Sequence, residues 1–383
     1  MRVGTIGLED FRNFERIVVD LAPELNLVVG RNAQGKTNLL ESIYCLGGLG
    51  SPRSPDGVLV RDGATRALVH ARVHRRSRTL KLDLEIRPGR GMRGLVNGTP
   101  VPRPSALSEI STTVFFGPDD LSLIKGSPEG RRRLLDDLVV KLRPARHGLR
   151  RQWERVLRQR NALLKSAPRR PPGSFEETLA VWDDSFCSAG AALAAARLEA
   201  LARLLPYTRK RYADVAGGGE LELGYASSWA EGDDLSSSAD ETRLREALAR
   251  AVADARPREL ERGVSLVGPQ RDDVVVQLGS GGRESGALLD ARAYASQGDQ
   301  RTAALAIKLA ESDLLSDALG EHPILLLDDV FSELDPARRS WLADAVRGEG
   351  RQVVLTSAEP GAALSARADL VLEVEEGRVR PRG

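Results

Sequence analysis

A glycine-rich octapeptide near the start of the chain has the composition of a phosphate-binding loop. It follows a short apolar run at residues 25–29 and precedes residues 38–46, whose leucines and isoleucine recur at helical spacing. Its residues are Gly30, Arg31, Asn32, Ala33, Gln34, Gly35, Lys36 and Thr37. The glycines allow backbone N–H groups to close around phosphate oxygens, while Lys36 reaches the β and γ phosphates and the Thr37 hydroxyl binds Mg²⁺. A fortuitous glycine-rich turn is the alternative, and the strand and helix on either side argue against it.

Two neighbouring carboxylates follow a second apolar run. Residues 323–327 read Pro-Ile-Leu-Leu-Leu, which is typical of a buried strand, and Asp328 and Asp329 come directly after it. Since a phosphate loop needs a carboxylate to hold its metal ion, we expect Asp328 to bind Mg²⁺. Asp329 is then placed to orient or deprotonate the attacking water. An acidic cap at the end of a strand is the alternative, and it competes more strongly for Asp329 than for Asp328.

A turn containing Ser296 and Gly298 opens a predicted helix roughly thirty residues before the acidic strand. Its spacing from that strand resembles the signature motif of ABC-type ATPases. In those proteins the serine and glycine contact the γ-phosphate that the opposite subunit holds. The sequence Ser-Glu-Leu-Asp at residues 332–335 resembles the D-loop of the same superfamily. Both resemblances imply that Ser296 acts across a dimer.

The elements that must position these residues lie at both ends of the chain. Alternating or apolar segments predict strands within 3–21, at 25–29, 79–86, 274–278, 324–327, 353–355 and 370–374. Apolar residues at helical spacing predict long helices at 129–164 and 175–205, separated by a proline-rich turn at 168–173, and a third at 241–255. We therefore expect an α/β fold, a P-loop ABC-type ATPase head built from residues 1–130 and 263–383, with an inserted α-helical lobe at 131–262.

The composition narrows the possible classes of protein. The 383 residues include 41% hydrophobic and 29% charged residues, which is ordinary for a globular chain of two or three domain-sized units. The two cysteines, Cys45 and Cys187, lack a metal-ligand spacing. The sequence shows no export signal and no apolar run of membrane-spanning length, so we expect a cytoplasmic protein without a membrane partner. The net charge of +2 does not by itself indicate nucleic-acid binding.

The combination of motifs resembles the RecF family, relatives of the SMC proteins in bacterial recombinational repair and replication. The resemblance covers nearly the whole chain. The segments that carry it are residues 8–14, 35–41, 116–121, 125–136, 268–273 and 296–298.

The resemblance implies ATP-dependent dimerisation on DNA at gaps or single-strand to duplex junctions, followed by weak, DNA-stimulated hydrolysis that releases the dimer. It also implies partner proteins of the RecO and RecR type that help to load a recombinase. Carried to this chain, it implies that Lys36 and Thr37 hold ATP and Mg²⁺ and that Asp328 holds Mg²⁺. It further implies that Asp329 supports hydrolysis and that Ser296 acts across the homodimer.

The chain departs from the family pattern at several positions. Gln270 stands where the family more often has histidine, and Asp299 stands where such turns usually have Gln or Glu, so the roles of both side chains are left open. No Q-loop glutamine is evident near Phe116, and Thr356 is followed by Ser357, without the switch histidine of transporters. These two departures predict slow hydrolysis.

The arginines of residues 131–133 and 150–160 are candidates for sequence-independent, salt-sensitive contacts with DNA phosphates. A solvated basic helix face with ion pairs explains them at least as well. A metabolite kinase or GTPase is disfavoured because no Asn-Lys-x-Asp motif is present. A transporter ATPase is disfavoured by the missing switch histidine and the long helical insertion. A DNA clamp or scaffold that binds ATP as structural glue, with negligible hydrolysis, remains the alternative.

Overall fold

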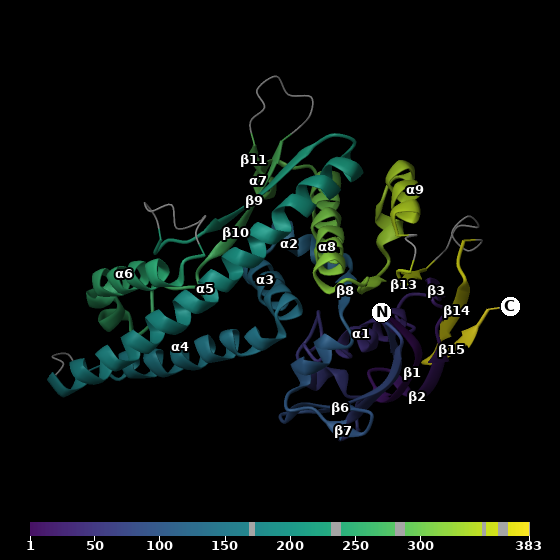
Figure 1. Cartoon of the computed structure of the whole chain (residues 1–383), viewed down its shortest axis with the longest axis horizontal. Coiled ribbons are helices and arrows are strands. Elements are labelled where there is room, and N and C mark those ends of the chain that lie inside the picture. The colour runs from purple at the N-terminus through teal and green to yellow at the C-terminus, as the bar shows by residue number, and fades with distance from the viewer. Residues whose placement is uncertain (168–172, 231–238, 280–287, 347–349, 359–366, 383) are drawn as a thin grey trace. The chain divides into compact units, whose positions relative to one another are not determined.

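The computed structural model describes residues 1–167, 173–230, 239–279, 288–346, 350–358 and 367–382, and the chain separates into two compact units (Figure 1). The first unit consists of Met1–Leu121, Lys210–Gly218 and Ser296–Gly383. The second consists of Ser122–Arg209 and Gly219–Ala295. The helix α5 (Gly173–Ala216) contributes residues to both. No helix among the described residues has the length and apolarity needed to cross a membrane.

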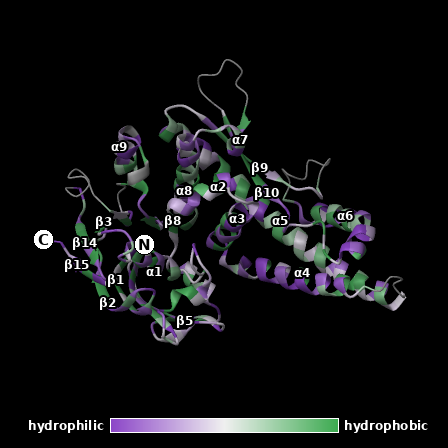
Figure 2. Cartoon of the chain, turned by 180° about the vertical axis from the view of Figure 1, so that it is seen from behind, coloured by the Kyte–Doolittle hydropathy of each residue, from purple (hydrophilic) through white to green (hydrophobic). Residues whose placement is uncertain are grey.

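The second unit combines helices with a small antiparallel sheet. Its helices are α2 (Ser122–Lys125), α3 (Pro128–Leu142), η4 (Pro144–Gly148), α4 (Leu149–Lys165), most of α5, α6 (Glu241–Arg262) and α7 (Ala291–Tyr294). Its strands are β9 (Glu220–Ala226), β10 (Asp273–Gly279) and β11 (Leu289–Asp290), in the order β11-β10-β9. Much of α4 is hydrophilic, as the purple colouring in Figure 2 shows.

The helices α4 and α5 run antiparallel, as the sequence predicts for two helices that fold back on each other. Arg160 of α4 contacts Asp183 of α5, and Trp153, two turns earlier in α4, packs on Phe186 with ring centroids 4.6 Å apart. Most of the proline-rich segment between them, residues 168–172, lies outside the described residues. The single helix expected over 129–164 is interrupted instead, because Pro144 cannot continue a helix in its interior and α3 ends at Leu142.

The bounds of the units differ from those expected from the sequence. The strand at 274–278 exists as β10, but it pairs with β9 and not with the strands that carry Asp328 or the phosphate loop. The residues up to Ala295 therefore belong to the second unit, which contains a three-stranded sheet as well as helices. Residues 210–218, at the end of α5, belong to the first unit.

The first unit contains a mainly parallel sheet whose strands come from both ends of the chain. Its order is β15-β14-β3-β13-β12-β8, with β15 (Arg378–Pro381) antiparallel to its neighbour. The parallel strands are β3 (Leu25–Val29), β8 (Thr113–Phe116), β12 (Ile324–Leu327), β13 (Val353–Ser357) and β14 (Leu370–Glu375). Every residue of β3, β8, β12 and β13 is buried, as expected for parallel strands covered on both faces. Parallel alignment brings the carboxyl ends of β3 and β12 to one edge of the sheet.

A second, antiparallel sheet of the first unit has the order β2-β1-β4-β5-β6-β7. Its strands are β1 (Arg2–Phe11), β2 (Phe14–Asp20), β4 (Ala67–Arg75), β5 (Arg78–Arg87), β6 (Gly91–Val96) and β7 (Thr99–Pro100). The other elements of the unit are η1 (Asp56–Leu59), η2 (Pro104–Glu109), η3 (Pro118–Leu121), α1 (Lys36–Cys45), α8 (Gln297–Leu319), η6 (Val330–Glu333) and α9 (Pro336–Ala345).

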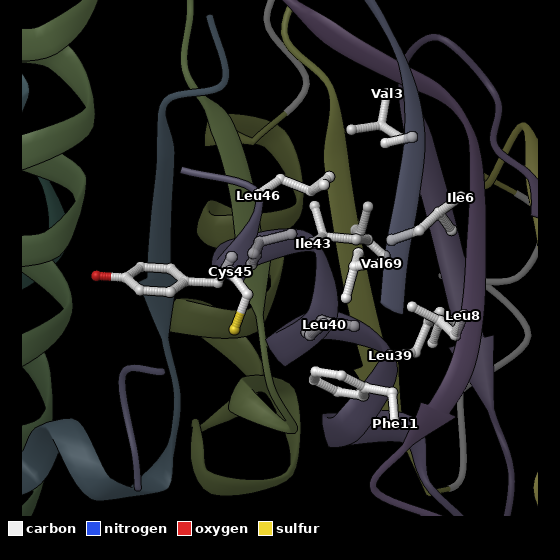
Figure 3. Close-up of a cluster of buried hydrophobic side chains, with 14 of the residues drawn as sticks. Val3, Ile6, Leu8, Phe11, Leu39, Leu40, Ile43, Cys45, Leu46 and Val69 are labelled. Atoms are coloured by element: carbon white, nitrogen blue, oxygen red, sulfur yellow. The ribbon is translucent and has the colours of Figure 1, made fainter. Parts of the chain in front are cut away.

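The helix α1 joins the two sheets through an apolar core. Its side chains Leu39, Leu40 and Ile43 lie against those of β1, including Leu8 and Phe11 (Figure 3), and all five are fully buried. Burial of each such side chain contributes about 1.5–3 kcal/mol. The core therefore fixes the helix whose first residues are Lys36 and Thr37.

Candidate nucleotide-binding site

The segment between β3 and α1 has the backbone of a tight phosphate loop. Gly30 has a φ of 152°, Ala33 of 63° and Gly35 of 115°. A Cβ on Gly30 would lie 2.3 Å from the carbonyl oxygen of Val374, and one on Gly35 would lie 2.6 Å from Nδ2 of Asn13. Both positions thus require glycine for conformation, and Gly30 also requires it for space beside the backbone of Val374. The predicted strand, loop and helix are present in this order.

Two hairpin turns hold the loop from outside. Asn13, in the turn between β1 and β2, donates from Nδ2 to the carbonyl oxygen of Gln34 at 2.8 Å. Its Oδ1 accepts from Nδ2 of Asn38 at 2.8 Å. The backbone N–H of Glu376, in the turn between β14 and β15, donates to Oε1 of Gln34 at 2.6 Å. Sequence reasoning missed the contributions of Asn13, Asn38 and Glu376. The sequence sign of Asn13 and Asn38 is their place in the segments 8–14 and 35–41 that carry the family resemblance.

The ammonium group of Lys36 lies inside the loop. Its Nζ donates to the carbonyl oxygens of Gly30 at 2.6 Å and Arg31 at 2.9 Å. Burial lowers the pKa of Lys36, and the nearby charges of Asp329 and Asp328 act in the opposite direction. The loop thus holds a cation at the start of a helix, where phosphate oxygens bind favourably.

Asp328 is the centre of a cluster of buried and half-buried oxygen atoms. Thr37 donates from Oγ1 to both carboxylate oxygens, at 2.9 and 2.8 Å, and Thr356 at the end of β13 donates to Oδ1 at 2.7 Å. Burial raises the pKa of Asp328, and the two hydroxyl groups partly offset this effect. A hydroxyl and a carboxylate side by side are the hard oxygen donors that Mg²⁺ prefers. The residues present therefore fit a magnesium ion, which Thr37 and Asp328 would hold.

Asp329 occupies a strained position one residue further on. Its φ of 50° is left-handed, a conformation that costs about 1–3 kcal/mol for a residue other than glycine. The backbone N–H of Asp329 donates to Oγ1 of Thr356 at 2.8 Å, so one threonine holds both acidic residues. Asp329 also borders a small pocket together with Phe116 and Arg301. This position suits a carboxylate that acts on a water molecule near the phosphate loop. Thr356 was not predicted as a site residue.

Ser296 lies in a different group of contacts. It is the N-cap of α8, where its Oγ donates to Oδ2 of Asp299 at 2.7 Å and accepts from the backbone N–H of Asp299 at 3.2 Å. Arg301 shares the pocket beside Asp328, and Ser296 is five residues before it, about 7 Å further along the helix axis. Across the described residues, the side-chain hydrogen bonds of Ser296 stay within its own turn. The structure thus brings Lys36, Thr37, Asp328 and Asp329 together without Ser296.

Two of the arginines considered for DNA contact serve inside the second unit. Arg131 donates to both carboxylate oxygens of Asp273, at 2.7 and 2.8 Å, and is buried. Arg160 is fully buried and donates to Asp183 at 2.8 Å and Glu259 at 2.6 Å. Guanidinium groups buried with carboxylates are not available to phosphates. For these two arginines the ion pairs of the alternative explanation are present, but the groups are buried and not on a solvated face.

The motif at residues 268–273 also has a structural role. Gln270 donates from Nε2 to the carbonyl oxygen of Val267 at 2.8 Å, closing its own turn. The buried carboxylate of Asp272 accepts from the Tyr225 hydroxyl at 2.6 Å and from the Trp229 indole at 2.8 Å. Burial raises the pKa of Asp272 more than the hydrogen bonds from Tyr225 and Trp229 lower it, and the resulting pKa is about 6. Arg197 of α5 donates to the carbonyl oxygen of Pro269 at 2.8 Å, so the motif ties β9 and the start of β10 to this helix.

Comparison with known proteins assigns this architecture. The model of the RecF/RecN/SMC N terminal domain matches residues 2–379. The DNA replication and repair protein RecF of Streptomyces avermitilis is 44% identical over 99% of both chains. The chain belongs to the RecF family. The RecF protein of Beutenbergia cavernae is 45% identical over 94% of both chains.

Solved structures agree with this membership. The recombination mediator protein RecF of the RecFOR pathway, solved with ATPrS, matches with a TM-score of 0.87 and 29% identity, covering 100% of this chain and 98% of that one. The same protein with ATP matches with a TM-score of 0.87 and 28% identity over 100% and 97%. An Smc head domain from Pyrococcus furiosus, with a TM-score of 0.56 and 16% identity over 99% and 95%, shares the fold alone. The predicted α/β, ABC-type ATPase head is confirmed.

Proposed function

We propose that this RecF-family chain is an ATP-dependent DNA-binding protein of recombinational repair and replication, in which ATP and Mg²⁺ make two copies associate. The observation that carries the proposal is the division of the site. Lys36, Thr37 and Asp328 form one cluster, while the side-chain hydrogen bonds of Ser296 stay within its own turn among the described residues. A second copy would bring its own Ser296 and Gly298 to the nucleotide. Solved RecF relatives with ATP support the choice of nucleotide.

Each site residue then has a defined task. Residues Gly30 to Thr37 bind the triphosphate through backbone N–H groups, and the Lys36 charge offsets that of the phosphate oxygens. Thr37 and Asp328 hold Mg²⁺, which when bound neutralises charge on the phosphates. Asp329 accepts a proton from the attacking water or orients it. Slow hydrolysis releases the dimer.

The family membership and the RecFOR setting of its solved relatives motivate the rest of the proposal. The DNA is gapped or has a single-strand to duplex junction, and binding is independent of sequence. Partner proteins of the RecO and RecR type act with the dimer to load a recombinase. Because the DNA partner is cytoplasmic in bacteria, we place the protein in the cytoplasm.

Sedimentation analysis tests the ATP-dependent association. The wild-type chain is expected to be a monomer without nucleotide or with ADP, and a dimer with ATP and Mg²⁺. Ser296→Arg is expected to raise the dimer dissociation constant at least about tenfold, because a bulky side chain at the turn prevents close approach. Its affinity for ATP as a monomer stays unchanged. Ser316→Arg, at the other end of α8, is the matched control. A wild-type chain that stays monomeric with ATP contradicts the proposal.

The exposed face of α4 is the surface we assign to DNA. Arg151, Arg155 and Arg158 are exposed and recur at helical spacing on this hydrophilic helix (Figure 2). Replacing all three with alanine is expected to weaken binding to gapped DNA about tenfold in moderate salt. The slope of log affinity against log salt falls by about 2–3, since each lost phosphate contact removes about 0.9.

A matched variant controls for the loss of three charges. Arg78, Arg90 and Arg93 are exposed residues of the antiparallel sheet and its β5–β6 turn, in the first unit. Their replacement by alanine should leave the salt slope within one unit of the wild-type value. Equal losses in the two triple variants would show that net charge, and not the α4 face, determines binding.

A second candidate function is the DNA clamp or scaffold. Thr356 contributes a hydroxyl to the acidic pair, where transporter ATPases have a switch histidine nearby, and this difference favours slow or negligible hydrolysis. In that case ATP binding would hold the dimer together without measurable turnover.

A further inference from the structure

The carboxylate of Asp299 joins the Ser296 turn to the helix α9. One oxygen, Oδ2, accepts the hydroxyl hydrogen of Ser296 at 2.7 Å. The other, Oδ1, lies 3.9 Å from Nη2 of Arg338, in the first turns of α9. A negative charge is thus bonded directly to the serine that, under the proposed function, meets a triphosphate.

Arg338 is fixed beside this turn by further contacts. Its Nη1 lies 3.2 Å from Oδ2 of Asp335, the N-cap of α9, whose Oδ1 also accepts the backbone N–H of Arg338 at 3.0 Å. A Cβ on Gly298 would lie 3.4 Å from Nη1. This is an ordinary van der Waals distance, so the guanidinium lies close to the backbone of the turn. The side chain of Arg338 is 28% exposed, so the group is neither buried nor freely solvated.

Tyr212, in the last turns of α5, lies close to both charged groups. Its side chain is buried, which raises the pKa of its hydroxyl group. The charge of Asp299 raises this pKa further, and the charge of Arg338 lowers it.

These contacts create a problem of charge. A carboxylate in the first turn of α8 favours the helix, because it interacts with the positive end of the helix dipole. The same carboxylate repels the γ-phosphate that Ser296 would contact. If no cation offset the Asp299 carboxylate, its repulsion of the γ-phosphate in this partly exposed site would weaken association about tenfold.

We propose that Arg338 is a positioning residue of the Ser296 turn, offsetting the charge of Asp299 so that the turn accepts the triphosphate held by a second copy. The inference rests on the proposed ATP-dependent dimer and deepens it. It assigns a role to Asp299, whose carboxylate departs from the Gln or Glu usual in such turns. It also links α9, which follows the Asp329 segment, to the residues that act across the dimer.

A double-mutant cycle tests this role. Dimer dissociation constants are measured by sedimentation with ATP and Mg²⁺ for the wild type, Arg338→Ala, Asp299→Asn and the double variant. Arg338→Ala is expected to weaken the dimer about tenfold, because Asp299 is left uncompensated. Asp299→Asn alone leaves it unchanged or tighter. The double variant returns to within about threefold of the wild type, since the charge that needed Arg338 is gone.

Controls separate this role from a structural one. Arg338→Lys keeps the charge and should retain most of the dimer affinity, and all variants should bind ATP as monomers with wild-type affinity. A double variant as weak as Arg338→Ala would overturn the inference, since Arg338 would then act by holding Asp335 and α9. If the wild type dimerises and Arg338→Ala matches it, the inference fails while the proposed function stands. If the wild type never dimerises, the proposed function itself fails.

Discussion

Lys36→Met is expected to lower the affinity for ATP by about 10- to 150-fold, and with it to disrupt ATP-dependent dimerisation. The Lys36 side chain is buried in the loop, where two backbone carbonyl groups hold its ammonium group. A charge-assisted hydrogen bond contributes about 1.5–3 kcal/mol, and methionine supplies the apolar stem without the charge. Calorimetric titration with ATP and Mg²⁺ measures the loss.

Two companion measurements make this result specific. Lys165→Met changes an exposed lysine at the end of α4 and should leave ATP affinity unchanged. The rate of phosphate release then separates the switch from the scaffold. If the wild type and Lys36→Met both show negligible hydrolysis while DNA binding survives in each, the clamp or scaffold function is correct.

The central part of the site could be predicted from sequence because its residues lie next to short, contiguous signals. Gly30 to Thr37 form one octapeptide, and Asp328 directly follows an apolar strand. The supporting residues could not be predicted, because only the order of the strands in the sheet brings them to the site. Thr356 meets Asp328 since β13 pairs with β12, and Glu376 meets Gln34 since β14 pairs with β3. No local pattern encodes these pairings.

Prediction of the fold succeeded where a local sequence pattern was sufficient. It failed where the pairing of distant strands was needed. The alternation at 274–278 predicts a strand correctly, but only the pairing of Asp273 with Ala226 assigns it to the second unit. The arginines at positions 131 and 160 look in sequence like parts of exposed basic clusters. Their carboxylate partners, Asp273 and Glu259, are respectively 142 and 99 residues away, so only the folded chain reveals their burial.

Asp329→Asn is expected to slow ATP hydrolysis by about 10²–10³, because asparagine keeps the shape of the side chain but cannot accept a proton. Thr37, Asp328 and Lys36 remain in place, so ATP affinity should change less than about threefold. The dimer should therefore persist with ATP for longer than the wild-type dimer.

Phosphate release under single-turnover conditions, with sedimentation of the same samples, measures both properties of Asp329→Asn. Asp344→Asn, which changes an exposed carboxylate of α9, is the control and should hydrolyse ATP at the wild-type rate. A variant at Asp329 that loses the dimer together with hydrolysis would show that this carboxylate maintains the structure of the site. Unchanged hydrolysis would move the catalytic role to another group.

Because the left-handed backbone of Asp329 is held by Thr356, Thr356→Val should also slow hydrolysis, by displacing Asp329 without removing its carboxylate.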